Sequence, residues 1–299
     1  MTILQNAWQR FQLEFAGPVK LRVRTAARDV LGVAAQDGLS IEVREARKKL
    51  VDVGASFLPS GDIEVAGVRF HASYPTFACV LAEIFHHEQY NFSLGGTWVA
   101  FDIGANAGAS SLWLASSENV RHVYAFEPVP PTYGMLLENL ALNPDLHRKI
   151  RPFPLGLGSR EETVTVSFHE EHVMSLSTKG TFDSCFNPTS QVPARIGRAD
   201  DLLRPLFSRH AESRIFLKVD CEGAEYDILP NLASAGLLRC ADVVIVEWHG
   251  GDHRQLLNIL DQDSFFCFVE WHKRGQWDVG MIKAVNTRAN GTSEYRSRG

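Results

Sequence analysis

The chain lacks the features that would assign it to several large protein classes. Its five cysteines are scattered and never form a C-x-x-C pair, which argues against a disulfide framework and a cysteine zinc site. The formal net charge is −5, so no overall positive field would attract nucleic acid. No apolar run approaches the roughly 18 residues of a membrane span, and the N-terminus has no signal-peptide core. We therefore expect a cytoplasmic protein that binds neither nucleic acid nor membrane; nothing indicates an oligomeric state.

The composition that remains is typical of a globular enzyme, with 45% hydrophobic and 22% charged residues among 299. Residues 62–73 ("DIEVAGVRFHAS") alternate apolar and polar across Ala66-Gly67, which predicts a hairpin. Residues 77–90 have the apolar spacing of a helix. We interpret residues 1–95 as an N-terminal accessory extension of mixed α and β structure. The polar residues 286–299 are predicted to be a flexible tail.

From residue 96 to residue 285, short apolar runs alternate with longer segments. The strand-like runs are 98–102, 122–127, 150–155, 215–220, 243–247, 265–270 and 281–285. Segments of helical length, such as 131–143 and 224–238, lie between them. This alternation predicts an α/β domain with a mostly parallel sheet that carries helices on both faces. Ligands of such sheets bind outside the carboxyl ends of the strands, which directs attention to the residues there.

A glycine turn follows the first of these strands, in "FDIGANAG". Asp102 precedes it, and Gly104 and Gly108 would let the backbone approach a ligand closely at the start of a helix. The spacing is G-x-x-x-G, which matches the dinucleotide fingerprint G-x-G-x-x-G poorly. A tight turn that binds no ligand is equally compatible with this segment alone.

An acidic residue ends the second strand. Glu127 lies 23 positions after Gly104 and is followed at once by Pro128. An acid about 20 residues beyond a glycine turn is placed to accept hydrogen bonds from both hydroxyls of a ribose. The order of strand, turn, helix, strand and acid therefore predicts a nucleoside site, with adenosine as the expected occupant.

Three carboxylates crowd around Gly223 after the run 215–220, namely Asp220, Glu222 and Glu225. Like charges at this spacing repel unless a cation, a metal or a shared proton offsets them, and such groupings often mark function. Glu225 is also compatible with a simple role in the first turn of the next helix. Asp220, at the tip of the strand, is the stronger functional candidate.

The next strand ends in Glu247, Trp248 and His249. Adjacent tips that carry Asp220, Glu247 and His249 would converge on one cleft, as a general-base cluster or as ligands of a hard divalent metal. Both readings stay open at this point. A second histidine pair, in "HEEH" at residues 169–172, has no further ligand nearby and is interpreted as solvated surface.

At these residues the sequence resembles the FkbM family of S-adenosylmethionine-dependent methyltransferases. The matching motifs are "FDIGANAG" (101–108), "YAFEPVPPTYGMLLENLALN" (124–143), "LKVDCEGAEYDIL" (217–229) and "VVIVEWHG" (243–250). The resemblance covers roughly residues 95–285. It implies the Rossmann-like, seven-stranded class I methyltransferase sheet with its last strand antiparallel. It also implies methylation of a hydroxyl oxygen on a small molecule, a sugar or a glycan.

The resemblance also implies roles for single positions. The residues that would surround the methionine end of S-adenosylmethionine are Asp102, Gly104, Asn106 and Gly108. Glu127 would hold the ribose, and the adenine wall is expected at 154–159, where the backbone around Gly158 would take part. The family commonly has a Leu-Asp pair before the strand 215–220, for which Asp200 or Asp201 would stand in. Residues 170–200 resemble nothing that we can assign.

For the chemistry, Asp220 is the first candidate for the base, and Glu247 or His249 the second, with a divalent metal left open. Two other functions fit less well. A nicotinamide-dependent oxidoreductase or epimerase would have the full glycine fingerprint and often a Tyr-x-x-x-Lys pair, but no Tyr of this chain has Lys four positions later. A non-catalytic module that only binds the cofactor would have little reason to keep the carboxylate cluster.

Overall fold

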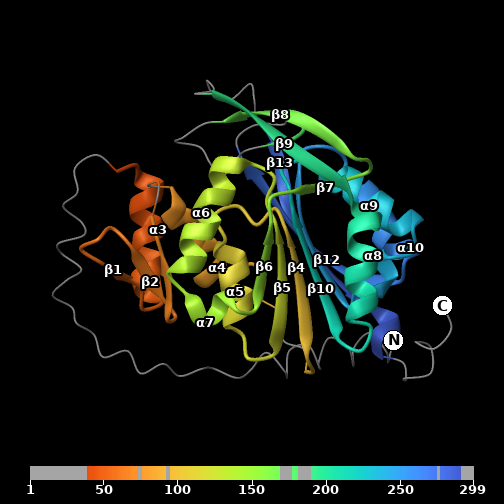
Figure 1. Ribbon diagram of the computed structural model, residues 1–299, viewed down its shortest axis with the longest axis horizontal. Helices are drawn as coiled ribbons and strands as arrows, with labels where there is room; N and C mark the ends of the chain where they lie inside the picture. The colour runs from red at the N-terminus through yellow and green to blue at the C-terminus, as the bar shows by residue number, and fades with distance from the viewer. Residues whose placement is uncertain are drawn as a thin grey trace.

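The structure, a computed structural model, describes residues 39–72, 74, 76–91, 95–168, 177–180, 190–274 and 277–290 (Figure 1). Over these residues the chain forms a central seven-stranded sheet and two three-stranded sheets. The "HEEH" segment lies outside the described residues. None of the described helices combines the length and the apolarity that crossing a bilayer requires.

The central sheet contains all seven strands that the sequence predicts between residues 96 and 285. Its members, in spatial order, are β12 (Phe265–Arg274), β13 (Trp277–Asn286), β11 (Val243–His249), β10 (Arg214–Asp220), β4 (Trp98–Ile103), β5 (Val120–Phe126) and β6 (Ile150–Phe153). All six residues of β4 are buried, as expected for a central strand that is covered on both faces. The predicted α/β architecture is therefore confirmed.

The sheet is parallel except for one strand, β13. β4, β5, β6, β10 and β11 pair in parallel, whereas β13 pairs antiparallel with both β11 and β12. The chain adds strands in one direction from β4 to β6 and then returns to add β10 on the other side of β4. The strand order therefore reverses between β4 and β10, where open α/β sheets bind their ligands.

Helices cover the sheet on both faces (Figure 1). One face carries α4 (Phe77–Phe85), α5 (Ala109–Ser116), α6 (Pro130–Ala141) and α7 (Pro144–His147), and the other carries α8 (Ala199–Arg209), α9 (Glu225–Ser234) and α10 (His253–Gln262). Each face has its own hydrophobic cluster, and the sheet separates the two. Two short 3₁₀ helices complete the described elements: η2 (Leu238–Cys240) follows α9, and η3 (Thr287–Asn290) follows β13.

The N-terminal part of the described chain consists of α3 (Ile41–Asp52), β1 (Ser56–Phe57), β2 (Ile63–Val65), β3 (Val68–Phe70) and α4. The predicted hairpin is confirmed, because β2 and β3 pair antiparallel across Ala66 and Gly67, which have φ angles of 52° and 77°. The helix that the sequence predicts over 77–90 ends at Phe85 instead. The chain turns there, and Glu88 has a left-handed φ of 50°.

The N-terminal part shares its core with the central sheet. Leu50, Phe70 and Phe77 belong to the same buried cluster as Ala100 of β4 and Leu112 of α5. The backbone amide of His71 also donates to Asn139 of α6 at 2.7 Å. The boundary near residue 95 stays a prediction, but packing across it is continuous.

A further sheet, absent from the sequence prediction, lies above the carboxyl ends of the central strands (Figure 1). It consists of β7 (Gly156–Gly158), β9 (Ser190–Arg198) and β8 (Glu162–Phe168), with β9 in the middle. Ile196 of β9 packs so closely on β7 that a Cβ atom at Gly156 would lie 2.7 Å from its Cδ1. This contact fixes β7 beside the turn that follows β5.

Candidate active site

The turn after β4 lies directly against the end of β10. Gly104 has a φ of +81°, and a Cβ atom at this position would lie 1.8 Å from the carbonyl oxygen of Asp220. The ammonium of Lys218 donates to the carbonyl of Gly104 at 2.7 Å. Only glycine permits this close approach. It brings together the ends of β4 and β10, between which the strand order reverses.

Glu127 ties the same turn to the end of β5. Its carboxylate accepts from the backbone amide of Asn106 at 3.0 Å and from that of Val129 at 2.9 Å. The residue is only 5% exposed, and burial raises the pKa of Glu127 to about 7 against the opposing effect of these two amides. Glu127 therefore changes its charge near neutral pH, at a position that follows the end of β5.

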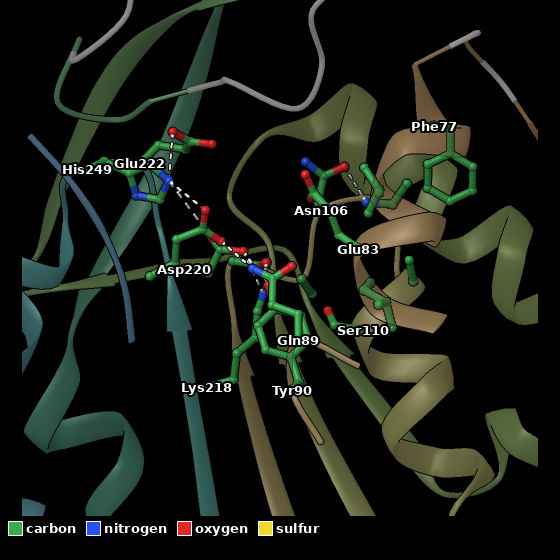
Figure 2. A pocket seen from close by; sticks show the side chains of 17 residues that line it. Phe77, Glu83, Gln89, Tyr90, Asn106, Ser110, Lys218, Asp220, Glu222 and His249 are labelled. Atoms are coloured by element: carbon green, nitrogen blue, oxygen red, sulfur yellow. Dashed lines mark hydrogen bonds and ion pairs between the residues drawn. The ribbon is translucent and has the colours of Figure 1, made fainter. Parts of the chain in front are cut away.

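Two clefts open at the carboxyl ends of the strands. The α4-side cleft contains about 550 Å³ of space that protein atoms leave free, open solvent included, and is lined by α4, Gln89, Tyr90, the turn after β4, and the ends of β10 and β11 (Figure 2). The β7-side cleft, with about 580 Å³ of such space, is lined by Glu127, Gly156, Leu157 and their neighbours. Both are lined by Gly104, Asn106, Asp220 and Glu222, so the clefts adjoin along these residues.

A buried ion pair lies beneath the turn. Asp102 is fully buried, accepts from the hydroxyls of Ser110 at 2.7 Å and Ser111 at 2.5 Å, and lies 3.0 Å from the ammonium of Lys218. Burial alone would lower the pKa of Lys218, but Asp102 and Asp220 raise it above its ordinary value. Lys218 is therefore charged, and it joins Asp102, Gly104 and Asp220 into one unit.

Asp220 presents its two carboxylate oxygens to different partners. Its Oδ2 accepts from the hydroxyl of Tyr90 at 2.9 Å and lies 3.4 Å from Lys218, whereas its Oδ1 lies 3.9 Å from Nε2 of His249. Burial alone would raise the pKa of Asp220, but Lys218, His249 and Tyr90 hold it below its ordinary value. Asp220 is thus an ionised carboxylate on both clefts.

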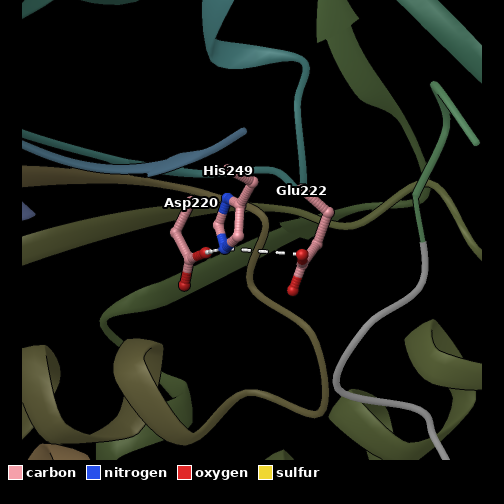
Figure 3. Close-up of side chains that lie close together, drawn as sticks. All are labelled: Asp220, Glu222 and His249. Atoms are coloured by element: carbon pink, nitrogen blue, oxygen red, sulfur yellow. Dashed lines mark ion pairs between the residues drawn. The ribbon is translucent and has the colours of Figure 1, made fainter. Parts of the chain in front are cut away.

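His249 is surrounded by carboxylates (Figure 3). Its Nε2 lies 3.4 Å from Glu222 and 3.8 Å from Glu247, in addition to Asp220. Burial alone would lower the pKa of His249, but Glu222, Glu225 and Glu247 raise it to about 10. The imidazole is therefore a cation at neutral pH. Asp220, Glu222 and His249 each also offer one donor atom within 4.8 Å of the others, a spacing at which they could share a metal ion.

Glu225 joins α9 to β11 rather than lining either cleft. It is fully buried, and its Oε1 accepts from the backbone amide of His249 at 2.6 Å while its Oε2 accepts from that of Gly223 at 2.9 Å. The same Oε1 lies 3.4 Å from Nδ1 of the imidazole. Glu225 therefore orients His249. This role goes beyond placing a favourable charge in the first turn of a helix.

The structure divides the six predicted cofactor residues into two groups. Gly104, Asn106 and Glu127 line a cleft. Asp102, Gly108 and Gly158 line neither: Asp102 pairs with Lys218 below the turn, Gly108 forms the N-cap of α5 with a φ of +88°, and Gly158 is packed under Ile196. At the predicted adenine wall, Gly156 and Leu157 line the cleft instead of Gly158.

The predicted catalytic residues do come together, because Asp220, Glu247 and His249 all line the α4-side cleft. Asp200 does not join them, since its carboxylate pairs with Arg198 at 2.7 Å. The sequence reasoning missed Lys218, Gln89 and Tyr90. Only Lys218 carried a signal, as a charged residue between apolar neighbours in the middle of a strand.

Comparison with known proteins identifies the family. A model described as the methyltransferase FkbM domain matches residues 102–267, more than half of the chain. The chain belongs to the FkbM methyltransferase family. The resemblance stated from the sequence motifs is thereby confirmed, and with it the reading of the chain as a methyltransferase rather than an oxidoreductase.

Similar proteins cover different shares of the FkbM chain. Methyltransferase sdnD of Sordaria araneosa is 26% identical over 233 residues, which are 70% of this chain and 88% of that protein. Hexuronic acid methyltransferase AglP of Haloferax volcanii is 27% identical over 165 residues, 55% of this chain and 62% of that protein. The crystal structure of methyltransferase FkbM from Methylobacillus flagellatus KT aligns with a TM-score of 0.43 and 15% identity over 70% of this chain and 54% of that one.

Proposed function

We propose that this protein is an S-adenosylmethionine-dependent O-methyltransferase that acts on a hydroxyl of a small molecule or a carbohydrate. The observation that carries the proposal is the common wall of Gly104, Asn106, Asp220 and Glu222 between the two clefts. A methyl donor in one cleft and an acceptor in the other would meet at this wall. Transfer requires the reacting atoms to be in line and close, which two adjoining clefts achieve.

The residues of the β7-side cleft suit a nucleoside. Glu127 offers two carboxylate oxygens that now accept from backbone amides and would accept from ribose hydroxyls when a ligand enters. The backbone of Gly156 and Leu157 provides a wall without protruding polar side chains. The turn at Gly104 and Asn106 leads from this cleft to the other. We therefore assign the adenosine to the β7-side cleft and the methionine end to the turn.

S-adenosylmethionine, when bound, supplies a methyl group on a positively charged sulfur. Asp220 and Glu222 at the common wall favour a cation electrostatically, and their effect is strong because the site is largely buried. Lys218 and His249 offset part of this negative charge. Both side chains are almost fully buried, so neither occupies the space that the donor needs. The charge of the wall thus suits a cationic donor.

Asp220 is the proposed proton acceptor. An oxygen that forms a bond to the incoming methyl carbon becomes positively charged, so its proton turns strongly acidic and an ionised carboxylate is basic enough to remove it. The pKa of Asp220 is held below its ordinary value, which keeps the carboxylate ionised at neutral pH. His249, with a pKa of about 10, is assigned the role of a cation that holds the carboxylates in place.

A methyl-transfer screen tests the proposal. Purified protein is incubated with S-[methyl-³H]adenosylmethionine and a panel of hydroxylated acceptors, including monosaccharides and hydroxylated polyketides, with and without a chelator. Label in an alkali-stable methyl ether supports O-methylation, whereas label released by mild alkali indicates a carboxyl methyl ester. The chelator arm shows whether the spacing of Asp220, Glu222 and His249 is used to bind a metal. No binding of S-adenosylmethionine by calorimetry would end the proposal.

A further inference from the structure

We propose that Gln89 and Tyr90, which precede the family domain, are positioning residues of the active site, and this inference rests on the proposed function. The family match begins at residue 102, so neither residue belongs to the motifs that identify the methyltransferase. Both nevertheless line the α4-side cleft (Figure 2). Their hydrogen bonds reach side chains 158 and 130 residues further along the chain.

The two residues hold the two neighbouring carboxylates in the same way. Tyr90 donates its hydroxyl to Oδ2 of Asp220 at 2.9 Å, and Gln89 donates its side-chain amide to Oε2 of Glu247 at 2.9 Å. Asp220 and Glu247 are register partners at the ends of β10 and β11. One oxygen of each carboxylate is therefore held by the segment that follows α4.

The other oxygen of each carboxylate faces His249. Oδ1 of Asp220 and Oε1 of Glu247 lie 3.9 Å and 3.8 Å from its Nε2, too far for a hydrogen bond. Because Tyr90 and Lys218 engage Oδ2 of Asp220, Oδ1 is the oxygen placed to receive the proton of an acceptor. Tyr90 thus determines which oxygen of Asp220 is available, and Gln89 fixes the position of Oε2 of Glu247 beside it.

The segment is built to hold this geometry. After α4 ends at Phe85, the backbone amide of Gln89 donates to the backbone carbonyl of Glu83 at 3.2 Å, and that of Asn91 to the backbone carbonyl of Glu88 at 2.8 Å. The ring of Tyr90 is buried, and the ammonium of Lys218 lies 5.3 Å from its centre. The hydroxyl and the ring therefore act on both members of the Asp220–Lys218 pair.

The same part of the chain forms the opposite wall of the cleft. Phe77, Val80, Glu83 and Ile84 of α4 line it. An acceptor that enters would lie between this wall and the two carboxylates, with Gln89 and Tyr90 at the junction. The segment therefore belongs to the acceptor side, which distinguishes its role from that of the residues around Glu127.

The test compares Y90F and Q89A with matched controls. Y124F removes a buried tyrosine hydroxyl that bonds His210 at 2.7 Å and lines neither cleft, and Q255A removes an exposed glutamine amide of α10. We measure S-adenosylmethionine affinity by calorimetry, thermal unfolding, and kcat and KM for the acceptor found in the screen. A hydrogen bond to a charged group changes an equilibrium by roughly ten- to a hundredfold.

We expect Y90F to lower kcat about tenfold or more and Q89A to raise the acceptor KM several-fold, with cofactor affinity within twofold of wild type. Y124F and Q255A should match wild type in both constants. If Y90F and Q89A also match their controls while wild type is active, this inference fails and the proposed function stands. If Y90F loses cofactor binding, Tyr90 acts on the donor side and the inference is equally wrong. If wild type neither binds cofactor nor transfers methyl, the proposed function itself has failed.

Discussion

The ammonium of Lys218 lies 2.7 Å from the carbonyl oxygen of Gly104, so a side chain of β10 holds the backbone of the turn that follows β4. The same ammonium pairs with Asp102 beneath the turn and with Asp220 at the clefts. One buried cation thus connects the turn assigned to the cofactor with the carboxylate assigned to the proton. The geometry of the two functions is set together.

Replacement of Lys218 should be severely destabilising. K218M leaves Asp102, which is fully buried, without its cation, and breaking a buried pair from one side costs about 3–5 kcal/mol of the free energy of unfolding. The double variant K218M/D102N removes both charges and should recover part of the loss. Urea unfolding at pH 7 measures both. K48M, whose partner Glu45 is exposed, serves as the control and should change little; equal stability of K218M and K48M would contradict the account.

Gly104 should not tolerate a side chain. G104A combines a left-handed φ with an overlap on the backbone of Asp220, whereas G54A has a similar φ of +83° and no atom within 4 Å of the added Cβ. We expect G54A to cost about 1–2 kcal/mol, from the backbone conformation alone. G104A should cost clearly more and abolish cofactor binding, as measured by unfolding and calorimetry. A G104A protein with the stability and affinity of G54A would refute the close approach.

Cofactor affinity should depend on pH through Glu127. The pKa of Glu127 is raised to about 7, and only the ionised carboxylate accepts from both ribose hydroxyls. We expect the Kd for S-adenosylmethionine to rise several-fold as the pH falls from 8 to 6. In E127Q the Kd should be larger than in wild type at pH 8 and nearly constant over this range. A pH-independent Kd in the wild type would remove Glu127 from the ribose site.

The raised pKa of Glu127 also predicts how the stability of the protein depends on pH. Because the folded-state pKa of Glu127 is above its unfolded value, the protein binds this proton more tightly when folded, and stability is lost as the pH rises from about 4.5 to about 7. E127Q removes this dependence. Ligand-free E127Q should therefore gain on wild type as the pH is raised, by at most about 3 kcal/mol at pH 8. Thermal unfolding at pH 4.5 and pH 8 gives the comparison; an advantage that shrank with rising pH would contradict it.

The proton acceptor is tested at Asp220. D220N keeps the size of the side chain and removes its charge, so turnover at saturating cofactor should fall by about a hundredfold or more, while the cofactor still binds, less tightly than to wild type. Single-turnover assays with saturating cofactor separate the two. D145N, at an exposed position that lines neither cleft, should retain full activity. Full activity of D220N would end the candidacy of Asp220.

Much of this fold follows from local patterns in the sequence. The apolar runs predict the strands best in the middle of the sheet, where all six residues of β4 are buried, whereas the edge strand β12 exposes Phe266, Val269 and Trp271. Ala66-Gly67 turns the hairpin because both positions adopt positive φ. The strand Glu162–Phe168 was missed although its exposed and buried residues partly alternate. Its partner Ser190–Arg198 lies across a long connection, and such pairing leaves no mark in a local window.

The sequence predicts those parts of the site that lie at the ends of strands. Asp220 and Glu247 end adjacent strands, so their proximity follows from the parallel sheet. The contacts of Gln89 and Tyr90 follow from no such rule, because they depend on where α4 ends and how its turn packs. The family resemblance placed Asp102 at the methionine end of the cofactor. Its side chain points below the turn instead, to Lys218 and two serines.

The central claim is that the crevice between the ends of β4, β5 and β10 binds S-adenosylmethionine across the common wall of the two clefts. A crystal structure with S-adenosylhomocysteine, the expected product, tests it most directly. The account predicts the adenosine in the β7-side cleft with its ribose hydroxyls on Glu127, and the sulfur beside Asp220. An empty crevice at saturating ligand, or a ribose bound away from Glu127, would contradict it.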